Sequence, residues 1–522
     1  MGVTGVTLGM RSASLSPLSG ASRANESRTV TPRACWRRAG RLVVGVAAAA
    51  ALACGDGSGP RETRHVSVQV GTRVSGRLAL AMSTGLQPAS YDAYDFQGFP
   101  GAVVPLGALQ PEHIRLQSIS DGNPQTGPST WNFTDLDAAT QPVLTVGDHS
   151  PELQLGQGPS FMYTAGGSLI DTTGRQFAAY AAQLVRYYNA GGFTASDGRH
   201  VSPGTHPIAW WGIYNEPNIN NVTAVQDAAL YNASVAAMEA VDPSLHFVAG
   251  EVTGDLYTVQ NYLPVALGGI RSRVDAVAIH LYSACGQADG DAKLMATVPT
   301  FAQSVQAARA ATLLNSLTAA APIWITENNV DADFDLGNGI SACTGNAFVI
   351  DPRGSSAFFA AWRPYVFSQV GQAGARALYH LSFFGDTQYG EINRATGADQ
   401  LSYSVDYWLA RTFPSPPGAD ILAVTSSDVQ DVEVLAVRND DQSVAVLVAN
   451  HAVASPRDNN GHGAPSVVRL DLSALGAFHG ASLVAIDART DPATGPVPGS
   501  ITPSPTVTIT FPGYGVAFLV LK

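Results

Sequence analysis

Two glutamates stand at the ends of apolar stretches that look like buried strands. Glu216 closes the segment WWGIYNE at 210–216, directly after Asn215 and directly before Pro217. Glu327 closes a second apolar segment, PIWITE at 322–327. Two carboxyl groups that face one site can divide the work of a proton donor and of a nucleophile or base. We therefore take this pair as the starting point for the chemistry of the chain.

Paired carboxyl groups are what the cleavage of a glycosidic bond requires. One group must donate a proton, and the other must stay ionised to attack or stabilise the anomeric carbon. A separation of about 5 to 5.5 Å predicts retention of configuration, and a gap of roughly 6.5 to 9.5 Å leaves room for water and predicts inversion. Asn215 is placed to donate to the sugar 2-hydroxyl, a contact that strengthens in the transition state. Pro217 lacks an N–H and is expected to end the strand pairing.

The elements that must position these groups alternate along the chain. Helical spacing of apolar residues predicts helices near 177–188, 224–241, 301–319 and 356–373. Between the helical stretches lie eight strand candidates: Leu78–Ser83, His113–Ser120, Pro142–Gly147, Ile208–Asn215, His246–Gly250, Ala276–Tyr282, Pro322–Glu327 and Ala377–Phe384. This alternation predicts an α/β fold, a (β/α)₈ TIM barrel over 77–412. Glu216 then ends strand four and Glu327 ends strand seven, at the mouth where barrels carry their catalytic groups.

The pattern changes after the Pro-rich segment FPSPPG at 413–418. Most of the later apolar runs alternate with period two, which predicts an all-β sandwich over 413–522. Residues 54–76 read as a linker, but His65–Val70 also alternates and is expected to add a strand to that sandwich.

The N-terminal residues 1–53 have the features of an export signal. A basic segment, WRRAGR at 36–41, precedes the apolar run 42–53, which is too short to span a bilayer as a typical helix. The sequence ALAC at 51–54 resembles a bacterial lipobox, which predicts that Cys54 becomes lipidated. The alternative is an ordinary signal peptide cut near Ala53. We expect an exported protein that meets a membrane only through this anchor, at the outer membrane, in the periplasm or at the cell surface, or else a secreted one.

Composition narrows the remaining classes of function. Only 13% of residues are charged, the formal net charge is −12, and no block of Lys and Arg indicates nucleic-acid binding. The 11 histidines form no HExxH motif, no paired CxxC is present, and no phosphate loop or dinucleotide fingerprint occurs, so we expect neither metal nor cofactor. Cys285 and Cys343 follow the sixth and seventh strand candidates and are expected to form a disulfide; the alternative is two unrelated buried thiols.

Short motifs around the two glutamates resemble a known group of enzymes. The segment YNEPN at 214–218 resembles the Asn-Glu-Pro signature of clan A glycoside hydrolases, and ITEN at 325–328 is similar to their second site. Arg115 in HIRLQS resembles the arginine of strand two in that clan, and His280 and Tyr282 in AIHLYS resemble the pair of strand six. The layout, together with WNFTDLD at 131–137 and the terminal GYGVAFLVL, looks most like glycoside hydrolase family 39 and its neighbours.

This resemblance implies a retaining enzyme on a (β/α)₈ barrel that cleaves oligo- or polysaccharides. Glu216 would be the acid/base and Glu327 the nucleophile. The residues expected to bind substrate or to support the nucleophile are Asn215, His280, Tyr282, Arg115, His149 and Phe383. One physical role of Tyr282 is a hydrogen bond that holds Glu327 ionised, and Arg115 would support the same negative charge.

Two of these residues have plain alternatives, and so has the function. His149 would touch sugar hydroxyls or be an ordinary loop histidine, and Phe383 would stack on a sugar or pack in the core beside Phe384. The alternatives for the chain are a transglycosylase of the same clan and a surface lipoprotein that binds polysaccharide without cleaving it. The motifs leave the sugar, exo or endo action and the oligomeric state open.

Overall fold

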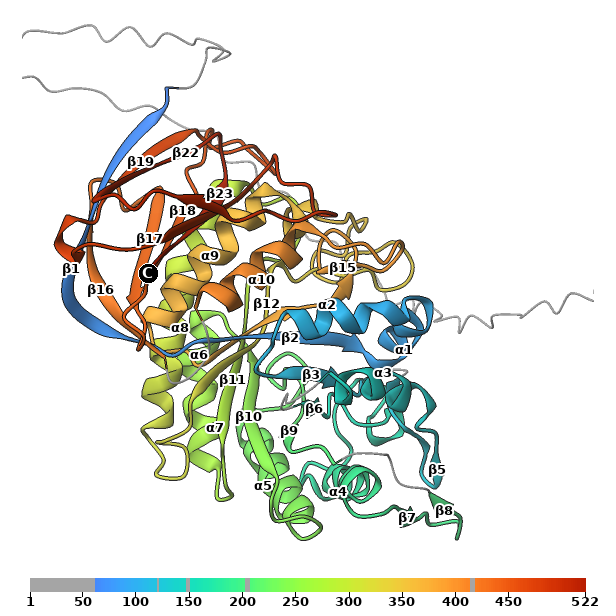
Figure 1. Ribbon diagram of the computed structural model, residues 1–522. Coiled ribbons are helices and arrows are strands. Elements are labelled where there is room, and N and C mark those ends of the chain that lie inside the picture. The colour runs from blue at the N-terminus through green and yellow to red at the C-terminus, as the bar shows by residue number, and fades with distance from the viewer. Residues whose placement is uncertain (1–61, 120–121, 147–150, 202–206, 414–417) are drawn as a thin grey trace, which may run out of the picture. The chain divides into compact units, whose positions relative to one another are not determined.

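The computed structural model describes residues 62–119, 122–146, 151–201, 207–413 and 418–522, and its main elements are a closed barrel and a nine-stranded sheet (Figure 1). The barrel strands lie in the ring order β10-β11-β12-β13-β2-β3-β6-β9, and neighbouring strands in the ring are parallel. This confirms the predicted TIM-barrel class. The eight strands are β2 (Ala81–Pro88), β3 (Ile114–Gln117), β6 (Glu152–Gln154), β9 (Trp210–Gly212), β10 (His246–Thr253), β11 (Ala276–Ala284), β12 (Ile323–Asp331) and β13 (Ala377–Leu381).

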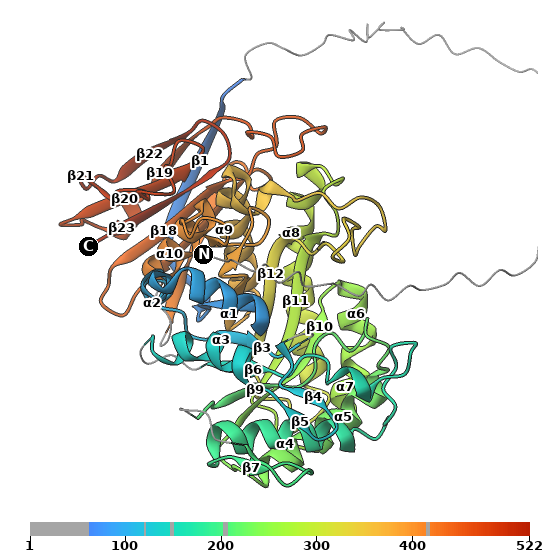
Figure 2. The same cartoon turned by 90° about the vertical axis from the view of Figure 1, so that its right-hand side faces the viewer.

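Helices follow the barrel strands and surround them (Figure 2). They are α1 (Ala89–Gly98), α2 (Val103–Ala108), α3 (Thr134–Leu144), α4 (Arg175–Asn189), α5 (Ala224–Glu239), α6 (Leu256–Asn261), α7 (Leu263–Gly269), α8 (Asp291–Thr312), α9 (Ala357–Gln372) and α10 (Leu401–Thr412). Short two-stranded pairs decorate the loops: β4 (Gln125–Gly127) with β5 (Thr130–Trp131), β7 (Phe193–Thr194) with β8 (His200–Val201), and β14 (Phe384–Gly385) with β15 (Ile392–Asn393).

Local sequence explains why two of these helices begin and pack as they do. Helix α5, which follows the strand of Glu216, starts at a capping box in which Thr223 and Gln226 satisfy each other's backbone N–H groups. Helix α9 is buried on nearly every side, because it packs against barrel strand β12 and against strands of the C-terminal sheet. A helix in that position needs apolar residues all round rather than one apolar stripe.

The third barrel strand lies later in the sequence than we predicted. Pro142–Gly147 is not a strand, because residues up to Leu144 form the end of helix α3, where Val143 is buried. The third strand is instead β6, three residues long, in which Glu152 and Gln154 are buried. A strand this short with polar side chains turned into the fold carries no apolar run, whereas the end of an amphipathic helix does.

The C-terminal part of the chain forms one nine-stranded sheet that encloses its own apolar core. Its order is β21-β20-β23-β18-β17-β16-β1-β19-β22. Strand β1 (Arg64–Leu78), from the N-terminal side of the barrel, pairs antiparallel with β16 and parallel with β19. The other strands are β16 (Ala419–Ser426), β17 (Val432–Arg438), β18 (Val444–Asn450), β19 (Ser466–Asp471), β20 (Ala481–Asp487), β21 (Gly499–Ile501), β22 (Thr506–Phe511) and β23 (Gly515–Leu521). The strands bury alternate valines such as Val66, Val446 and Val468, as period-two patterning requires.

The barrel interior is apolar at the bottom and polar towards the mouth. Trp210, Trp324 and Tyr379 form a cluster at the amino ends of their strands, and the Trp210 and Trp324 rings lie 4.6 Å apart. Trp211 points the other way, into the core beneath the helices, and is fully buried. The two tryptophans before Glu216 are therefore packing residues.

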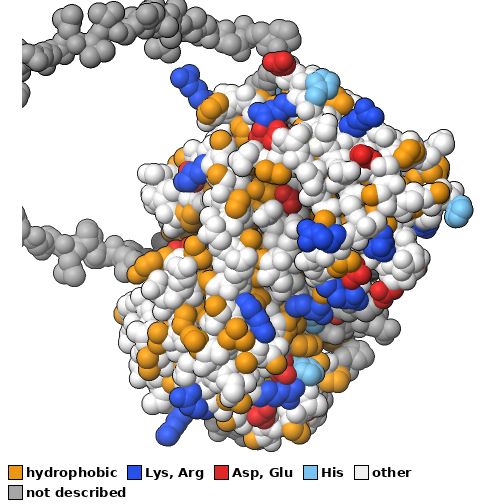
Figure 3. Space-filling view, turned by 90° about the vertical axis from the view of Figure 1, so that its left-hand side faces the viewer, with side chains coloured by type: hydrophobic (Ala, Val, Ile, Leu, Met, Phe, Trp, Pro, Cys, Tyr) orange, Lys and Arg blue, Asp and Glu red, His pale blue; other side chains and the backbone are white. Residues whose placement is uncertain are grey.

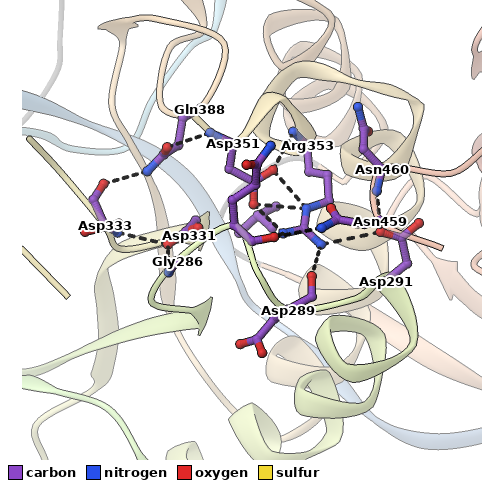
Figure 4. A network of polar contacts seen from close by, with 12 residues as sticks. Gly286, Asp289, Asp291, Asp331, Asp333, Asp351, Arg353, Gln388, Asn459 and Asn460 are labelled. Atoms are coloured by element: carbon purple, nitrogen blue, oxygen red, sulfur yellow. Dashed lines mark hydrogen bonds and ion pairs between the residues drawn. The ribbon is translucent and has the colours of Figure 1, made fainter. Parts of the chain in front are cut away.

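Hydrogen bonds to Asp291 at the start of α8 join the barrel to the C-terminal sheet. The Asp291 carboxylate accepts the backbone N–H groups of Asn460 at 2.7 Å and Gly461 at 2.8 Å, and the hydroxyl of Tyr514 at 3.3 Å. The fully buried guanidinium of Arg353 lies 3.4 Å from the same carboxylate. This side chain, together with a bond from Asn459 to the Gln287 carbonyl, fastens a long loop of the sheet domain to the barrel (Figure 4).

Arg353 also holds together the loops that follow β11 and β12. It forms an ion pair with Asp351 and donates to the carbonyls of Asp289 and Gln287. The structure joins Cys285 and Cys343 in a disulfide with Cα atoms 5.5 Å apart, between the same two loops. One side of the barrel mouth is thus a cross-linked wall.

On the face drawn in Figure 3, Lys and Arg side chains are spread among apolar and acidic ones rather than gathered in one block. Within the part of the chain that the structure describes, every helix is too short or too polar to cross a bilayer.

We predict that Asp291→Ala destabilises the protein much more than Asp289→Ala does. The first change leaves two backbone N–H groups and Arg353 short of a partner, which costs on the order of 3 kcal/mol. Asp289 is the matched control, because its carboxylate only meets the exposed Lys293, an interaction of about 0–1 kcal/mol. Thermal melts should show a fall of several degrees for Asp291→Ala alone. Equal melting temperatures would contradict the assigned role of Asp291.

Candidate active site

A strained turn after β9 places Asn215 and Glu216 at the barrel mouth. Tyr214 has φ of 66° and Glu216 has φ of 47°, the left-handed region that non-glycine residues rarely occupy. Each such residue costs on the order of 1–3 kcal/mol, and surrounding contacts must hold it. Here the Glu216 N–H donates to the carbonyl of Glu251 on β10 at 2.8 Å. The chain fixes this turn where it aims an amide and a carboxyl group into the mouth.

Glu327 on β12 is surrounded by donors. Its Oε1 accepts from Arg115 at 2.9 Å and from Gln117 at 3.0 Å, and its Oε2 accepts from the Tyr282 hydroxyl at 2.7 Å. Burial raises the pKa of this carboxyl group, but the charges of His280 and then Arg115 outweigh burial and bring the pKa below its usual value. Glu327 is therefore ionised at neutral pH and has a fixed orientation.

His280 on β11 lies between the two carboxyl groups of the mouth. Its Nδ1 is 3.0 Å from Glu216 Oε1 and 3.5 Å from Glu327 Oε2, while its Nε2 is 3.0 Å from Glu251 Oε2. Burial lowers the pKa of His280. The charge of Glu327 and the hydrogen bond to Glu216 outweigh burial and raise the pKa to about 10. The ring is then an imidazolium that donates from both nitrogens.

The carboxyl groups of Glu216 and Glu327 come close to each other through this arrangement. One oxygen of Glu216, one nitrogen of His280 and one oxygen of Glu327 all lie within 4.8 Å of one another. Glu327 is almost covered, whereas the Glu216 side chain is 18% exposed. The site therefore offers one enclosed carboxylate and one that solvent can reach, side by side.

Arg115 on β3 connects four strands. Its Nη1 binds Glu327, and its Nη2 binds Asn215 Oδ1 at 2.9 Å and Glu251 Oε2 at 3.0 Å. The guanidinium is completely buried, so its charge acts on these groups without screening by water. Because Arg115 uses the oxygen of the Asn215 amide, the Nδ2 of that amide is left to donate into the mouth.

Glu251 carries a buried negative charge beneath Arg115 and His280. Its Oε2 accepts from both of these cations and from the Thr326 hydroxyl at 3.1 Å. Burial raises the pKa of Glu251, but Arg115 and His280 more than compensate and lower it. Its other oxygen, Oε1, has no donor among the described residues.

That second oxygen faces another buried carboxyl group, that of Glu152. Glu152 Oε2 accepts only the Tyr379 hydroxyl at 3.0 Å, and its Oε1 also lacks a donor. The Oε1 atoms of Glu251 and Glu152 lie 2.8 and 2.9 Å from where a Cβ on Gly212 would stand, so any side chain at this position would have to displace both carboxyl groups. Burial and the neighbouring Glu251 raise the pKa of Glu152 to about 8. We infer that Glu152 keeps a proton and donates it to Glu251, which has the more numerous donors and stays ionised.

Two clusters each bring together three groups that could hold a metal ion. The first consists of Glu216, His280 and Glu327, and the second of His380, Glu391 and Asp406. In the second cluster, His380 Nδ1 binds Asp406 at 2.9 Å, and its Nε2 lies 2.8 Å from a backbone carbonyl. Asp406 also pairs with Arg363 at 3.0 Å. Both ring nitrogens and the carboxylate are used in internal bonds, so this cluster reads as a buried structural network.

The structure brings Arg115, Asn215, Glu216, His280, Tyr282 and Glu327 into one site, and Phe383 does not join them. Phe383 is fully buried against Phe96 and Phe384, so it has no face for a sugar and the stacking role is wrong. His149 lies outside the described residues, as does Cys54.

Four residues of the site escaped the sequence analysis: Gln117, Glu152, Glu251 and Thr326. Gln117 had a usable signal, because it stands two residues after Arg115 and therefore on the same face of the strand. Glu251 also had one, as the acidic residue in the otherwise uncharged end of a buried strand. Glu152 was hidden by the misplaced third strand.

We predict that two neighbouring isosteric changes, Glu152→Gln and Glu251→Gln, have opposite effects. The folded protein keeps a proton on Glu152 up to about pH 8, but the unfolded chain loses it near 4.5, so stability from this group falls as pH rises through that window. Glutamine donates the same hydrogen bond without titrating. Glu152→Gln should match the wild type at pH 5 and melt higher at pH 8.

Glu251→Gln should melt lower at pH 7, because it removes the charge that two buried cations share. The stabilisation from this carboxylate is present above its unfolded pKa and is lost only on acidification. Each variant serves as the control for the other. Parallel shifts of the two variants across pH 5 to 8 would show that the proton does not reside on Glu152.

Comparison with known proteins places the fold. No protein-family model matches the chain, and no curated protein matches it. Among solved structures, a monomeric beta-xylosidase from Caulobacter crescentus CB15 is 16% identical with a TM-score of 0.60, over 88% of this chain and 99% of that one. A GH51 alpha-L-arabinofuranosidase from Thermotoga petrophila is 12% identical with a TM-score of 0.59, over 88% and 100%. The GH39 enzyme from Xanthomonas axonopodis pv. citri is 16% identical with a TM-score of 0.56, over 89% and 98%.

These likenesses extend over barrel and sheet together, since they cover nearly the whole of each solved chain. The neighbours are clan A glycoside hydrolases, with GH39 enzymes among them. At these identities the comparison speaks for the fold, and the fold is that of the clan which the motifs around Glu216 and Glu327 resemble.

Proposed function

We propose that the protein is a retaining glycoside hydrolase. The observation that carries this proposal is the pairing of Glu216 and Glu327, whose nearest oxygens lie within 4.8 Å of each other. Retaining enzymes hold their two carboxyl groups about 5–5.5 Å apart, whereas inverting ones need roughly 6.5–9.5 Å to admit a water. This close approach favours direct attack by a carboxylate.

Glu327 suits the role of nucleophile. Three donors orient it and two cations keep it ionised, so it can attack the anomeric carbon and form a covalent bond to the sugar. As that bond forms, the bond from the anomeric carbon to the leaving oxygen breaks. Glu216, which solvent reaches, gives its proton to that oxygen.

The second step reverses these roles. The Glu216 carboxylate takes a proton from a water molecule, and the water oxygen attacks the anomeric carbon and releases Glu327. His280 contacts both carboxyl groups. Its positive charge can therefore stabilise whichever of the two is ionised at each step. Asn215 Nδ2 donates to the sugar hydroxyl next to the anomeric carbon, held by the bond from Arg115 to its oxygen.

The titles of the solved neighbours suggest which sugars to test first. Several name a beta-xylosidase, a xylanase or an alpha-L-arabinofuranosidase, which act on pentose units, and two name a glucosidase and a bifunctional glucanase-xylanase. We therefore propose pentosides as first candidates, with hexosides as the comparison.

We also propose export, with lipidation of Cys54, on the strength of the leader motif. The Cys285–Cys343 disulfide supports the export, because such bonds persist in oxidising compartments outside the cytosol.

The test is hydrolysis of 4-nitrophenyl β-xyloside, α-L-arabinofuranoside and β-glucoside by the wild type, Glu216→Ala and Glu327→Ala. Each substitution should lower kcat by about 100-fold or more, with the thermal melt retained. Added azide separates the two roles. It should restore turnover of Glu327→Ala with a glycosyl azide of inverted configuration, and that of Glu216→Ala with one of retained configuration.

A variant of either glutamate with near-normal turnover would show that the assignment is wrong. Wild-type products of inverted configuration would contradict the retaining mechanism while leaving hydrolysis intact.

A further inference from the structure

A cavity of about 520 Å³ lies beside the acid/base, outside the mechanism given above. Its volume is within the range of ~300–1,000 Å³ that is common for small-molecule sites. The cavity is built from the loops that follow β3, β6 and β9, and neither Glu216 nor Glu327 lines it. The lining residues that matter here are Asn123, Gln125, Gln157, Tyr163, Tyr214 and Asn220.

Hydrogen bonds tie this cavity to the backbone of the catalytic turn. Asn220 donates from Nδ2 to the carbonyls of Asn215 at 3.2 Å and Glu216 at 3.0 Å. Gln157 Nε2 lies 3.5 Å from the same Asn215 carbonyl. The cavity therefore shares a wall with the turn that carries Glu216.

The walls of the cavity are preformed. The Tyr163 hydroxyl accepts the N–H of Gly158 at 2.8 Å and donates to the Tyr214 hydroxyl at 3.2 Å. Asn123 donates to the Gln157 carbonyl at 3.3 Å and accepts the N–H of Gln125. Side chains held in this way lose little freedom when a ligand binds, which favours affinity.

The polar groups of the cavity are amides and hydroxyls. None of the described residues lining it is Asp, Glu, Lys, Arg or His. Gln125 donates from Nε2 to the Pro128 carbonyl at 3.3 Å, but its Oε1 is buried without any donor among the described residues. A buried acceptor without a donor is unfavourable, and a ligand hydroxyl that reaches it as the side chain turns would remove this penalty.

We propose that this cavity is a subsite for one uncharged sugar unit, bound through hydroxyl groups to Gln125 and the neighbouring amides. The inference rests on the proposed function and narrows its substrates to neutral glycans. A uronic acid would bring a carboxylate into a cavity where no described lining residue is a cation, and desolvation of that charge would go uncompensated by them.

The test is calorimetric binding of trisaccharides to the Glu327→Gln protein, which should not consume them. The neutral probes are xylotriose, cellotriose and mannotriose, and the acidic probe is trigalacturonic acid. At least one neutral probe should bind, and the acidic one should not. Adding Gln125→Ala should weaken that binding by about 5- to 10-fold, the size of one hydrogen bond.

Gln303→Ala is the matched control, because Gln303 is an exposed glutamine on α8 and belongs to no part of the site. It should leave the affinity unchanged. The subsite proposal is overturned if no neutral probe binds, if the two glutamine variants behave alike, or if trigalacturonic acid binds as well as the neutral probes.

Hydrolysis by the wild type is read separately, so that the two proposals can fail independently. If the wild type hydrolyses aryl glycosides but Gln125→Ala leaves trisaccharide binding unchanged, the subsite is refuted and the proposed hydrolase is not. Binding that depends on Gln125, with no hydrolysis by the wild type, would support the subsite and refute the retaining hydrolase.

Discussion

The buried guanidinium of Arg115 is the constraint on which the rest of the site depends. A fully desolvated cation must be met by negative charge and good hydrogen-bond geometry, or burial is too costly. Here Glu327 on β12, Glu251 on β10 and Asn215 in the turn after β9 meet it, so the ends of β3, β9, β10 and β12 must all close round one point. A closed barrel can bring four strand ends within reach of one side chain, which no single hairpin or helix could do.

Charge balance extends that constraint one layer downward. Arg115 and His280 are cations, Glu327 and Glu251 are the matching anions, and a further anion at Glu152 would be in excess. The site resolves this by leaving Glu152 protonated, which turns a repulsive neighbour into a hydrogen-bond donor. Gly212 belongs to the same solution, because any side chain there would separate the two carboxyl groups. The catalytic pair is therefore supported by a second acidic pair, with opposite protonation of its two members.

The sequence predicted most of what depends on local pattern. Apolar runs located seven of the eight barrel strands, and the residues at the ends of those runs brought out Glu216 and Glu327. The pattern failed at β6, where three residues with inward polar side chains carry no apolar signal and the end of α3 imitates a strand. It failed again at Phe383, because the last residues of a strand can face the core or the mouth and only tertiary packing decides. Glu152 was out of reach because the sequence misplaced its strand. Gln125 was out of reach because an acceptor atom without a donor can be seen only in three dimensions.

One side of the barrel mouth is cross-linked, and the other is lined by neutral polar groups. This difference bears on how a substrate would be recognised. After β11 and β12, a disulfide and the Arg353 network lock the loops, and this wall can position the nucleophile without moving. After β3, β6 and β9, the loops instead enclose a cavity whose polar groups are neutral. In the proposed mechanism, the fixed charged groups around Glu327 take part in bond cleavage, a step that is the same for every sugar. Neutral amides on the other side can distinguish one arrangement of hydroxyls from another, because leaving a buried amide unpaired is costly. In the proposed enzyme, catalysis and selectivity thus fall on opposite walls, so the amide-lined loops can vary without disturbing Arg115.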